Sequence, residues 1–430
     1  MTMKRTVYIA SVLALMISFT GCDDIFNSKS NKDTDEIFDI GRIDPSLENV
    51  DGYAPVLPFW GEFDAPTDVH VGFDEFVYVT DNHGVHLLDR ADLSPRVTIP
   101  LTGAISVTQD RLLNVYVAAR IDTVIESIDP NITWNLPAVF KIKNMNGAGP
   151  IEYVDTLIFP FDDASLSTTA AQNARLNRNS AINYEMVEVT GVTVLADNSI
   201  YVTRRGPFTE TSNVAAPDNT VLEFQRQRVD GVLTDKMINV RQIRTLNPTI
   251  PSLRSGVGIS AITSFISPPQ RDIFSDDRSF IITQAQQNKD IPFRVLWINA
   301  VETVDGLVFQ QNSDLLKQDT TQADGFLYEA YKFENPVDVT FGGDDDAFIF
   351  VVDAAQHKLY QFQLNGQEGV PPPAGVEDQT KQIVVSFGGF GADSKQFNTP
   401  SGVAYFDKVL YVADTGNNRI SRFKLTSDFE

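Results

Sequence analysis

The sequence has little of the residue chemistry on which most metal and redox sites depend. It contains one cysteine and four histidines in 430 residues. No HExxH, CxxC or P-loop motif occurs, and no glycine-rich dinucleotide fingerprint follows an expected strand. These absences exclude the common motif-based metal, redox and nucleotide sites. A single cysteine also excludes intramolecular disulfides, so an exported domain of this chain must be stable through its core alone.

Positive charge is also scarce. The chain has 34 Lys and Arg residues against 57 Asp and Glu residues, and its formal net charge is −23. Nucleic acids and anionic lipid surfaces attract proteins through a positive field. We therefore expect neither as a broad partner, and solubility is the simplest role of the negative charge.

The apolar run near the N-terminus is too short to span a membrane comfortably. Val7 to Phe19 is a mostly apolar stretch of thirteen residues, whereas a spanning helix needs about 20. Lys4 and Arg5 precede this stretch. A short positive region followed by an apolar run is typical of a secretory signal.

The signal ends at the only cysteine of the chain. Phe19-Thr20-Gly21-Cys22 resembles a bacterial lipobox, with Phe in place of the usual leucine. This resemblance implies that residues 1–21 are removed and that Cys22 is acylated, which anchors a protein by burying methylenes at about 0.8 kcal/mol each. The alternative is a leftover buried thiol, but we expect no core around residue 22.

The composition changes twice after the signal. Residues 22–52 are rich in Asp, Asn, Ser and Lys, which predicts a flexible acidic tether with a root-mean-square reach near ~30 Å. From residue 53 to residue 430, short runs of Val, Ile, Tyr and Phe alternate with Gly, Pro, Asn and Asp. This texture predicts one all-β domain.

The β domain is internally repetitive. Residues 397–425 read FNTPSGVAYFDKVLYVADTGNNRISRFKL, residues 333–364 and 63–90 repeat this pattern, and weaker copies occupy 105–120, 189–205 and 258–284. The C-terminal copy resembles the NHL repeat. The resemblance implies a β-propeller, and six copies of the repeat give six blades. Packing the blades radially buries both faces of every sheet. We place fourth strands at 151–159 and 306–310.

The last copy lacks its outer strand. Only three strands fit before Glu430, so we predict that Pro55 to Trp60 supplies the fourth strand and closes the ring. The prolines in this segment are tolerable on an outer edge.

Aligned blades place one residue each at the end of the second strand. Asp81, Asp353 and Asp414 occupy this position in three blades. We interpret them, with Asn417 and Asn418, as structural turn residues, because an Asp that ends a strand can accept backbone N–H bonds. The three consecutive middle blades break the pattern with Ala119, Arg204 and Gln284.

The middle blades also carry the expected long loops. These loops follow the second strands at 120–138, 206–220 and 285–293 and precede the first strands at 161–186 and 311–332. Long loops on a rigid scaffold often carry function, although drift in unimportant loops would give the same pattern. Arg120, Arg204 and Arg205 would lie near the channel mouth, either neutralised by acids such as Asp122 or Glu210, or binding an acidic ligand. Trp134 is either a binding platform or the cap of a small core within its loop.

The sequence thus predicts a lipid-anchored cell-envelope protein, on the periplasmic side or the cell surface. We expect a monomer that binds a protein or glycan partner through one propeller face, with no catalytic residue, metal or cofactor. The resemblance implies this function, because NHL propellers commonly act as interaction platforms. The alternative is an enzyme similar to propeller lyases and lactonases, whose metal lies at the channel mouth.

Replacing Cys22 tests the anchor directly. We expect Cys22→Ala to leave the precursor uncleaved and unlabelled when cells are grown with a fatty-acid probe, because the acyl acceptor is missing. Normal labelling of this variant would disprove the lipoprotein interpretation.

Overall fold

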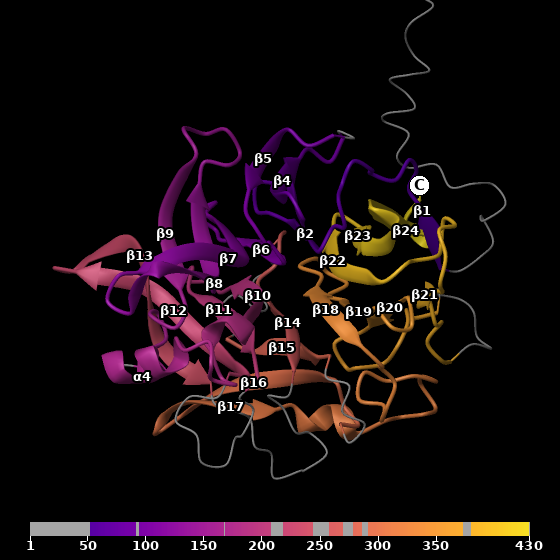
Figure 1. Ribbon diagram of the computed structural model, residues 1–430. Coiled ribbons are helices and arrows are strands. Elements are labelled where there is room, and N and C mark those ends of the chain that lie inside the picture. Colours follow the sequence, from indigo (N-terminus) through magenta and orange to yellow (C-terminus); the bar gives the residue numbers. More distant parts are fainter. Residues whose placement is uncertain are drawn as a thin grey trace, which may run out of the picture.

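Six four-stranded antiparallel sheets surround a channel in the computed structural model (Figure 1). The structure describes residues 52–91, 94–166, 168–207, 218–243, 258–269, 278–285, 291–372 and 380–429. The sheets confirm the predicted six-bladed β-propeller. The predicted signal and nearly all of the predicted tether lie outside the described residues. Within those residues, no helix combines the length and apolar character needed to cross a membrane.

Each blade is built from four strands that are numbered from the channel outward. Blades 1 to 3 consist of β2 (Asp68–Val71), β3 (Val77–Asp81), β4 (Gly84–Leu88) and β5 (Val97–Pro100); β6 (Ser106–Gln109), β7 (Val115–Ile125), β8 (Asp129–Lys143) and β9 (Glu152–Ile158); and β10 (Glu188–Val194), β11 (Ile200–Arg205), β12 (Thr220–Val229) and β13 (Val232–Ile243). Blades 4 to 6 consist of β14 (Ile259–Ser264), β15 (Phe280–Gln284), β16 (Val295–Thr303) and β17 (Gly306–Gln311); β18 (Pro336–Phe341), β19 (Ile349–Asp353), β20 (Lys358–Phe362) and β21 (Phe387–Gly388); and β22 (Pro400–Phe406), β23 (Val409–Asp414), β24 (Arg419–Leu425) and β1 (Tyr53–Pro55). The predicted fourth strands at 151–159 and 306–310 correspond to β9 and β17.

The second strands are buried on both faces. Every residue of β3, β15 and β19 is buried, because each sheet is covered by its two neighbours. This explains why the strands are continuously apolar instead of alternating. The innermost strands of neighbouring blades contact one another around the channel, including β22 with β2. The core is therefore a set of apolar layers between blades.

The N-terminal segment closes the ring as predicted, with different strand bounds. Tyr53 pairs with Leu425, Pro55 pairs with Phe423, and Trp60 forms an isolated bridge with Ile420. The prediction placed the strand at residues 55–60. The ladder is interrupted between Val56 and Trp60 because Pro58 lies between them and proline has no N–H to donate.

The two ends of the channel carry different connections. We call the end with the second-to-third-strand turns and the blade-to-blade connections the upper face, and the other end the lower face. On the upper face, β7 and β8 form a long hairpin whose pairing extends, past a bulge, to Ile125 and Asp129. Segment 120–138, predicted to be a loop, therefore belongs mostly to paired strands. The sequence analysis missed this because the hairpin simply prolongs the second and third strands of blade 2.

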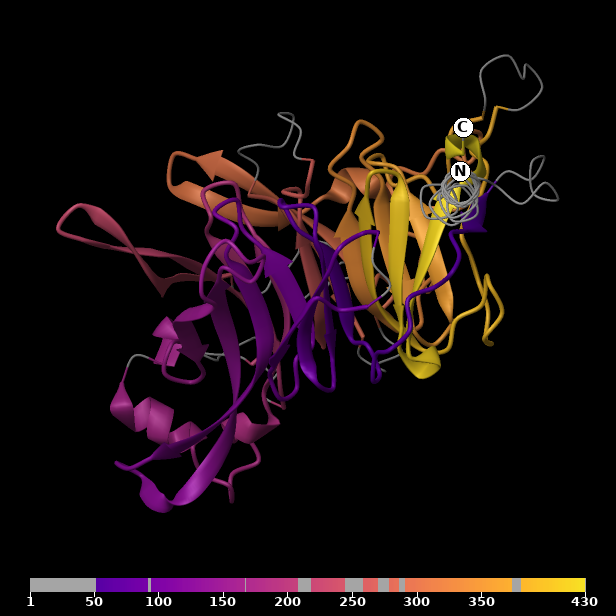
Figure 2. The same cartoon turned by 90° about the horizontal axis from the view of Figure 1, so that it is seen from above.

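The connection from β9 to β10 adds compact structure beside this hairpin. It contains the short helices η2 (Ala164–Leu166), α4 (Thr169–Arg175) and η3 (Tyr184–Met186). In Figure 2 the purple β7–β8 hairpin and magenta α4 extend well beyond one end of the ring. Parts of the predicted loops 206–220 and 285–293 lie outside the described residues.

Removing the closing segment tests its contribution to the whole ring. We expect deletion of residues 53–61 to lower the melting temperature by at least about 5 °C, because loss of even one large buried aromatic costs about 3–5 kcal/mol. Tyr53 and Trp60 are both buried. Deletion of residues 23–48, measured in parallel by calorimetry, should change the melting temperature little. Equal melting of both deletions and the parent would contradict the proposed role of the closure.

Candidate functional site

Three buried aspartates fix the upper-face turns. The Asp81 carboxylate accepts hydrogen bonds from the backbone N–H groups of Asp64 at 3.0 Å and His83 at 2.7 Å. Asp353 similarly accepts from Glu334 N at 2.7 Å and from Ala355 N at 3.0 Å. Each carboxylate thereby ties the end of a second strand to the segment that enters the first strand of its own blade.

Asp414 does the same in blade 6 with two further partners. Its carboxylate accepts from Asn398 N at 2.7 Å, Asn417 Nδ2 at 2.7 Å and Arg419 Nε at 2.9 Å. Asn418 adopts a left-handed conformation with φ 52°. Its Oδ1 accepts a hydrogen bond from Ala65 N at 2.9 Å, which joins this turn to the segment entering blade 1.

These aspartates do not fit a metal at the channel mouth. Both oxygens of Asp81 are engaged, because His86 Nε2 lies 2.7 Å from Oδ1 while Oδ2 accepts from Asp64 N. Burial opposes the charge of Asp81, but hydrogen bonds from Asp64 and His86 lower its pKa overall. Across the described ranges, no group of three or more His, Cys, Asp or Glu residues is placed to hold an ion. We therefore derive no metal-dependent step for this mouth.

The channel waist is narrow and carries two carboxylates. Asp68 Oδ2 accepts from Val107 N at 2.9 Å and Asp338 Oδ2 accepts from Val403 N at 2.7 Å, in each case from the next blade. Burial raises the pKa of Asp68 to about 7, and burial together with nearby Asp68 raises the pKa of Asp338. The cavity beside them has a volume of about 40 Å³. It has room for a few waters at most, so the carboxylates join blades rather than line a ligand pocket.

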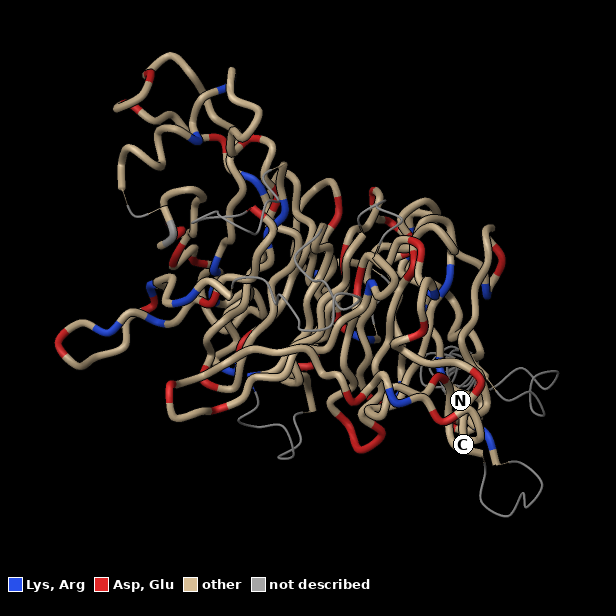
Figure 3. Tube along the Cα trace, turned by 90° about the horizontal axis from the view of Figure 1, so that it is seen from below, with Lys and Arg blue, Asp and Glu red and all other residues tan. Residues whose placement is uncertain are grey.

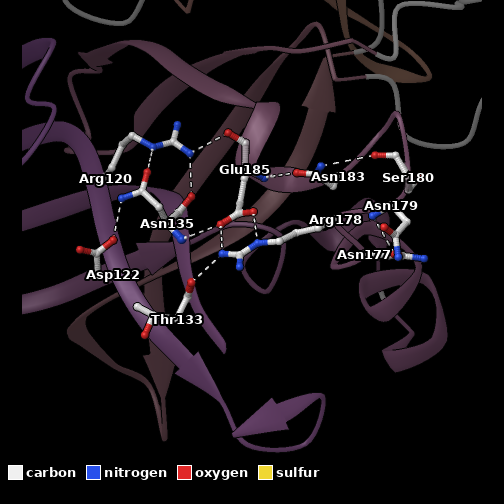
Figure 4. Close-up of polar contacts among 10 residues, drawn as sticks. All are labelled: Arg120, Asp122, Thr133, Asn135, Asn177, Arg178, Asn179, Ser180, Asn183 and Glu185. Carbon is white, nitrogen blue, oxygen red and sulfur yellow. Dashed lines mark hydrogen bonds and ion pairs between the residues drawn. The ribbon is translucent and has the colours of Figure 1, made fainter. Parts of the chain in front are cut away.

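Arg120 lies at the base of the β7–β8 hairpin and binds three backbone carbonyls, of which Figure 4 shows those of Asn135 and Glu185. Its Nη2 donates to Asn135 O at 2.7 Å and to Glu185 O at 2.9 Å, and its Nη1 donates to Val187 O at 3.1 Å. Its Nε donates to the Asn135 side chain. Burial lowers the pKa of Arg120, while nearby acids, Glu188 first, oppose that effect. Arg120 thus holds the hairpin against the β9–β10 connection.

A second arginine, which the sequence analysis did not identify, strengthens the same junction. Arg178 binds Glu185 through both carboxylate oxygens at 2.6 Å and donates to Thr133 O at 2.7 Å. Its guanidinium also lies 4.9 Å from the Trp134 ring centre. Trp134 is only 2% exposed and packs in a core with Leu136, Tyr184 and other residues. The structure therefore buries Trp134 in the large apolar layer that also contains Val192 and Leu222 of blade 3. It is not an exposed platform, and the core that it joins is larger than the loop core that was predicted as the alternative.

Arg204 is fully buried, at 0% exposure, beneath the β7–β8 hairpin and the β9–β10 connection. It forms an ion pair with Asp163 and donates to Tyr184 Oη at 2.8 Å and Asp218 O at 3.0 Å. Asp218 in turn pairs with Arg175 of α4. Arg204 thus faces the interior, where the Asp163 carboxylate already binds its guanidinium.

Arg205 points the other way. Its Nε lies 2.6 Å from Glu188 Oε2, and both side chains are partly exposed. Local neutralisation, one of the two predicted roles of the arginines, is thus seen for Arg204 and Arg205, with partners other than those expected. Asp122 reaches Arg120 only through the Asn135 amide, and Glu210 lies outside the described residues.

We call this unit the annex. It comprises the β7–β8 hairpin beyond Ala119 and the described part of the connection from Phe159 to Val187. The structure brings Arg120, Arg204 and Trp134 together in its base and core. The sequence analysis missed their partners Asp163 and Arg178 because both lie in an insertion that has no repeat register.

Comparison with known proteins agrees with the repeat analysis. Residues 397–423 match the family model of the NHL repeat. No curated protein matches this sequence. An auxiliary nutrient binding protein from Bacteroides thetaiotaomicron is 12% identical, with 87% of this chain and 72% of that chain covered and a TM-score of 0.47. A virginiamycin B lyase from Staphylococcus aureus is 13% identical, with 87% and 99% covered and a TM-score of 0.41.

A gluconolactonase from Xanthomonas campestris is 8% identical, with 89% of this chain and 93% of that chain covered and a TM-score of 0.43. Binding proteins and enzymes thus resemble the chain to a similar, low degree. These likenesses therefore do not distinguish binding from catalysis.

The adjacent residues Arg204 and Arg205 allow a comparison of how much a buried and an exposed ion pair contribute to stability at the base of the annex. We expect Arg204→Ala to destabilise the protein by roughly 3–5 kcal/mol, because it removes the guanidinium that pairs with the buried Asp163 carboxylate. Arg205→Ala removes the same side chain from a surface pair and should cost no more than about 1 kcal/mol. Denaturant unfolding of both variants provides the comparison. Similar losses in the two variants would contradict the assigned geometry.

Proposed function

We propose that this protein is a cell-envelope binding protein that recognises a protein or glycan partner through the annex on its upper face. The observation that carries this proposal is the construction of the annex. It extends beyond the ring (Figure 2), yet buried charges and an aromatic core fix its base. A rigid projection at the rim of a scaffold is suited to recognition, because little conformational entropy is lost on binding.

The outer surface of the annex offers a mixed contact area. Val124 near the hairpin tip, Met186 in η3 and Phe161 before η2 are all exposed apolar side chains. Arg178 of the annex and Arg205, at the end of β11 beside it, are also partly exposed. The Arg178 fork is already occupied by Glu185, whereas the Arg205–Glu188 pair is exposed to solvent. Arg205 can therefore exchange Glu188 for an acidic group of a partner, which arginine can bind through two parallel hydrogen bonds.

The position of the first described residue supports an envelope role in which the annex points outward. Gly52 O accepts a hydrogen bond from Thr426 N at 2.8 Å, at the lower end of β24. A tether that connects Gly52 to an acylated Cys22 would join the propeller at its lower face. The annex would then face away from the membrane.

Two hairpin tips on opposite faces allow a matched crosslinking test. Val124 lies near the upper tip and is 46% exposed, whereas Val232 lies at the lower tip of the β12–β13 hairpin and is 67% exposed. We expect a photoreactive benzoylphenylalanine at position 124, in living cells of the source bacterium, to give a discrete crosslinked adduct. The same residue at position 232 should give none, because that tip lies on the opposite face.

The positions at which adducts form decide whether the annex binds the partner. An adduct that is specific to position 124 and is lost in Arg205→Ala would support recognition of an acidic partner by the annex. Adducts from position 232 alone, or equal labelling at both positions, would contradict the proposal.

A further inference from the structure

A pocket of about 430 Å³ lies in the wedge between the last and first blades, on the lower face. Its walls come from the turn after β4 in blade 1, from the β22–β23 turn, and from β23 and β24 in blade 6. This volume lies within the range of small-molecule sites. We call it the seam pocket.

The seam pocket is basic although the protein is strongly acidic. Four cations line it, namely Arg90, Lys408, Arg422 and Lys424, against the two acids Asp89 and Asp407. Both acids are already paired, since Asp407 binds Arg90 at 2.9 Å and Asp89 binds Arg96 at 2.9 Å. Acidic residues are distributed over loops all round the ring (Figure 3), so this local excess of positive charge is unusual for the molecule.

The strand pairing explains why two of these cations enter the same pocket. Arg422 pairs with Tyr411 across the β23–β24 ladder, and Lys424 pairs with Val409. Directly opposed residues point to the same face of a sheet. All four residues therefore face blade 1. The seam pocket lies between them and the turn after β4.

Arg422 is the most buried of these cations. It is only 4% exposed, its Nη2 donates to Pro58 O at 2.7 Å, and its guanidinium lies 4.7 Å from the Trp60 ring centre. Its Nε is buried and has no hydrogen-bond partner. Among the described residues, neither Arg422 nor Lys424 forms an ion pair. Burial lowers the pKa of Arg422, as expected for a guanidinium without a carboxylate beside it.

A buried donor without an acceptor costs about 1–3 kcal/mol, and more when it is charged. An oxyanion in the seam pocket would neutralise Arg422 and Lys424, for which no ion pair is seen among the described residues. Arg422 Nε itself is covered, so the anion would contact the part of Arg422 that lines the pocket. Arginine and lysine are the residues that bind phosphate, through a fork and a point charge respectively. We propose that the seam pocket binds a phosphate-bearing ligand, with Arg422 and Lys424 as its main contacts.

The phosphate could belong to a soluble sugar phosphate or to a lipid headgroup. The lower face is where Gly52 meets Thr426, and Lys408 at the pocket binds Asp428 at 2.7 Å just beyond. A phospholipid headgroup could thus reach the pocket if the chain is anchored as proposed. The seam pocket itself lies on the face opposite the annex and does not depend on the proposed partner.

Calorimetric titration of the full chain in detergent at low ionic strength tests the site. The probes are glucose 6-phosphate, glycerophosphoglycerol as a deacylated lipid headgroup, and glucose as the uncharged control. We expect one phosphate probe to bind and glucose not to bind. Lys424→Ala should weaken binding roughly tenfold or more, because one charge-assisted contact is lost.

Lys143→Ala is the matched control. Lys143 also ends a third strand at the lower face, in blade 2, so its removal changes the net charge equally but leaves the seam pocket intact. Arg422→Lys keeps the charge and loses the fork, and circular dichroism verifies its fold. Tighter binding of glucose 6-phosphate would identify a soluble ligand, and tighter binding of glycerophosphoglycerol a lipid headgroup. Absence of binding to both probes, or equal weakening in Lys424→Ala and Lys143→Ala, would overturn the proposal.

Discussion

A four-stranded blade cannot bury both of its own faces, and most of this structure follows from that constraint. The second strands are apolar on both sides because a neighbour covers each side. The ring must therefore be complete, since a gap would expose two apolar faces at once. Trp60, Tyr411 and Ile420 fill the layer between blades 6 and 1. The chain closes this layer with its own N-terminal segment, so the two ends of the domain stabilise each other.

The same constraint explains why the upper-face turns depend on single aspartates. In blades 1, 5 and 6, a buried Asp at the end of the second strand accepts hydrogen bonds from backbone N–H groups of the segment that enters the first strand. These N–H groups would otherwise lack an acceptor. Blade 3 has Arg204 at this position, which supplies donors where blades 1, 5 and 6 supply an acceptor. Asp163 of the annex and the Asp218 carbonyl provide the matching acceptors. The inverted charge thus couples the insertion to the propeller.

How much the sequence revealed depends on the range of the interactions. Blade number, closure and the fourth strands at 151–159 and 306–310 could be predicted, because they follow from repeat spacing and apolar pattern. The burial of Arg204 could not, because it depends on Asp163, which lies 41 residues away in an insertion without register. Trp134 presented the same difficulty. An aromatic residue in a supposed loop gives no sign of the core that forms around it.

The seam pocket was invisible in the sequence for a related reason. Arg422 and Lys424 occupy alternate positions of β24, the third strand of blade 6, and nothing in the sequence distinguishes them from cations that face solvent. Only ring closure places Pro58 and Trp60 against Arg422 and buries it, while Asp407 of the pocket pairs with Arg90 instead. The segment that completes the core therefore also creates an unsatisfied charge. On the upper face the insertions pair their own charges, whereas at the lower seam Arg422 and Lys424 have no ion-pair partner among the residues that the structure describes. The two faces are thus suited to different ligands.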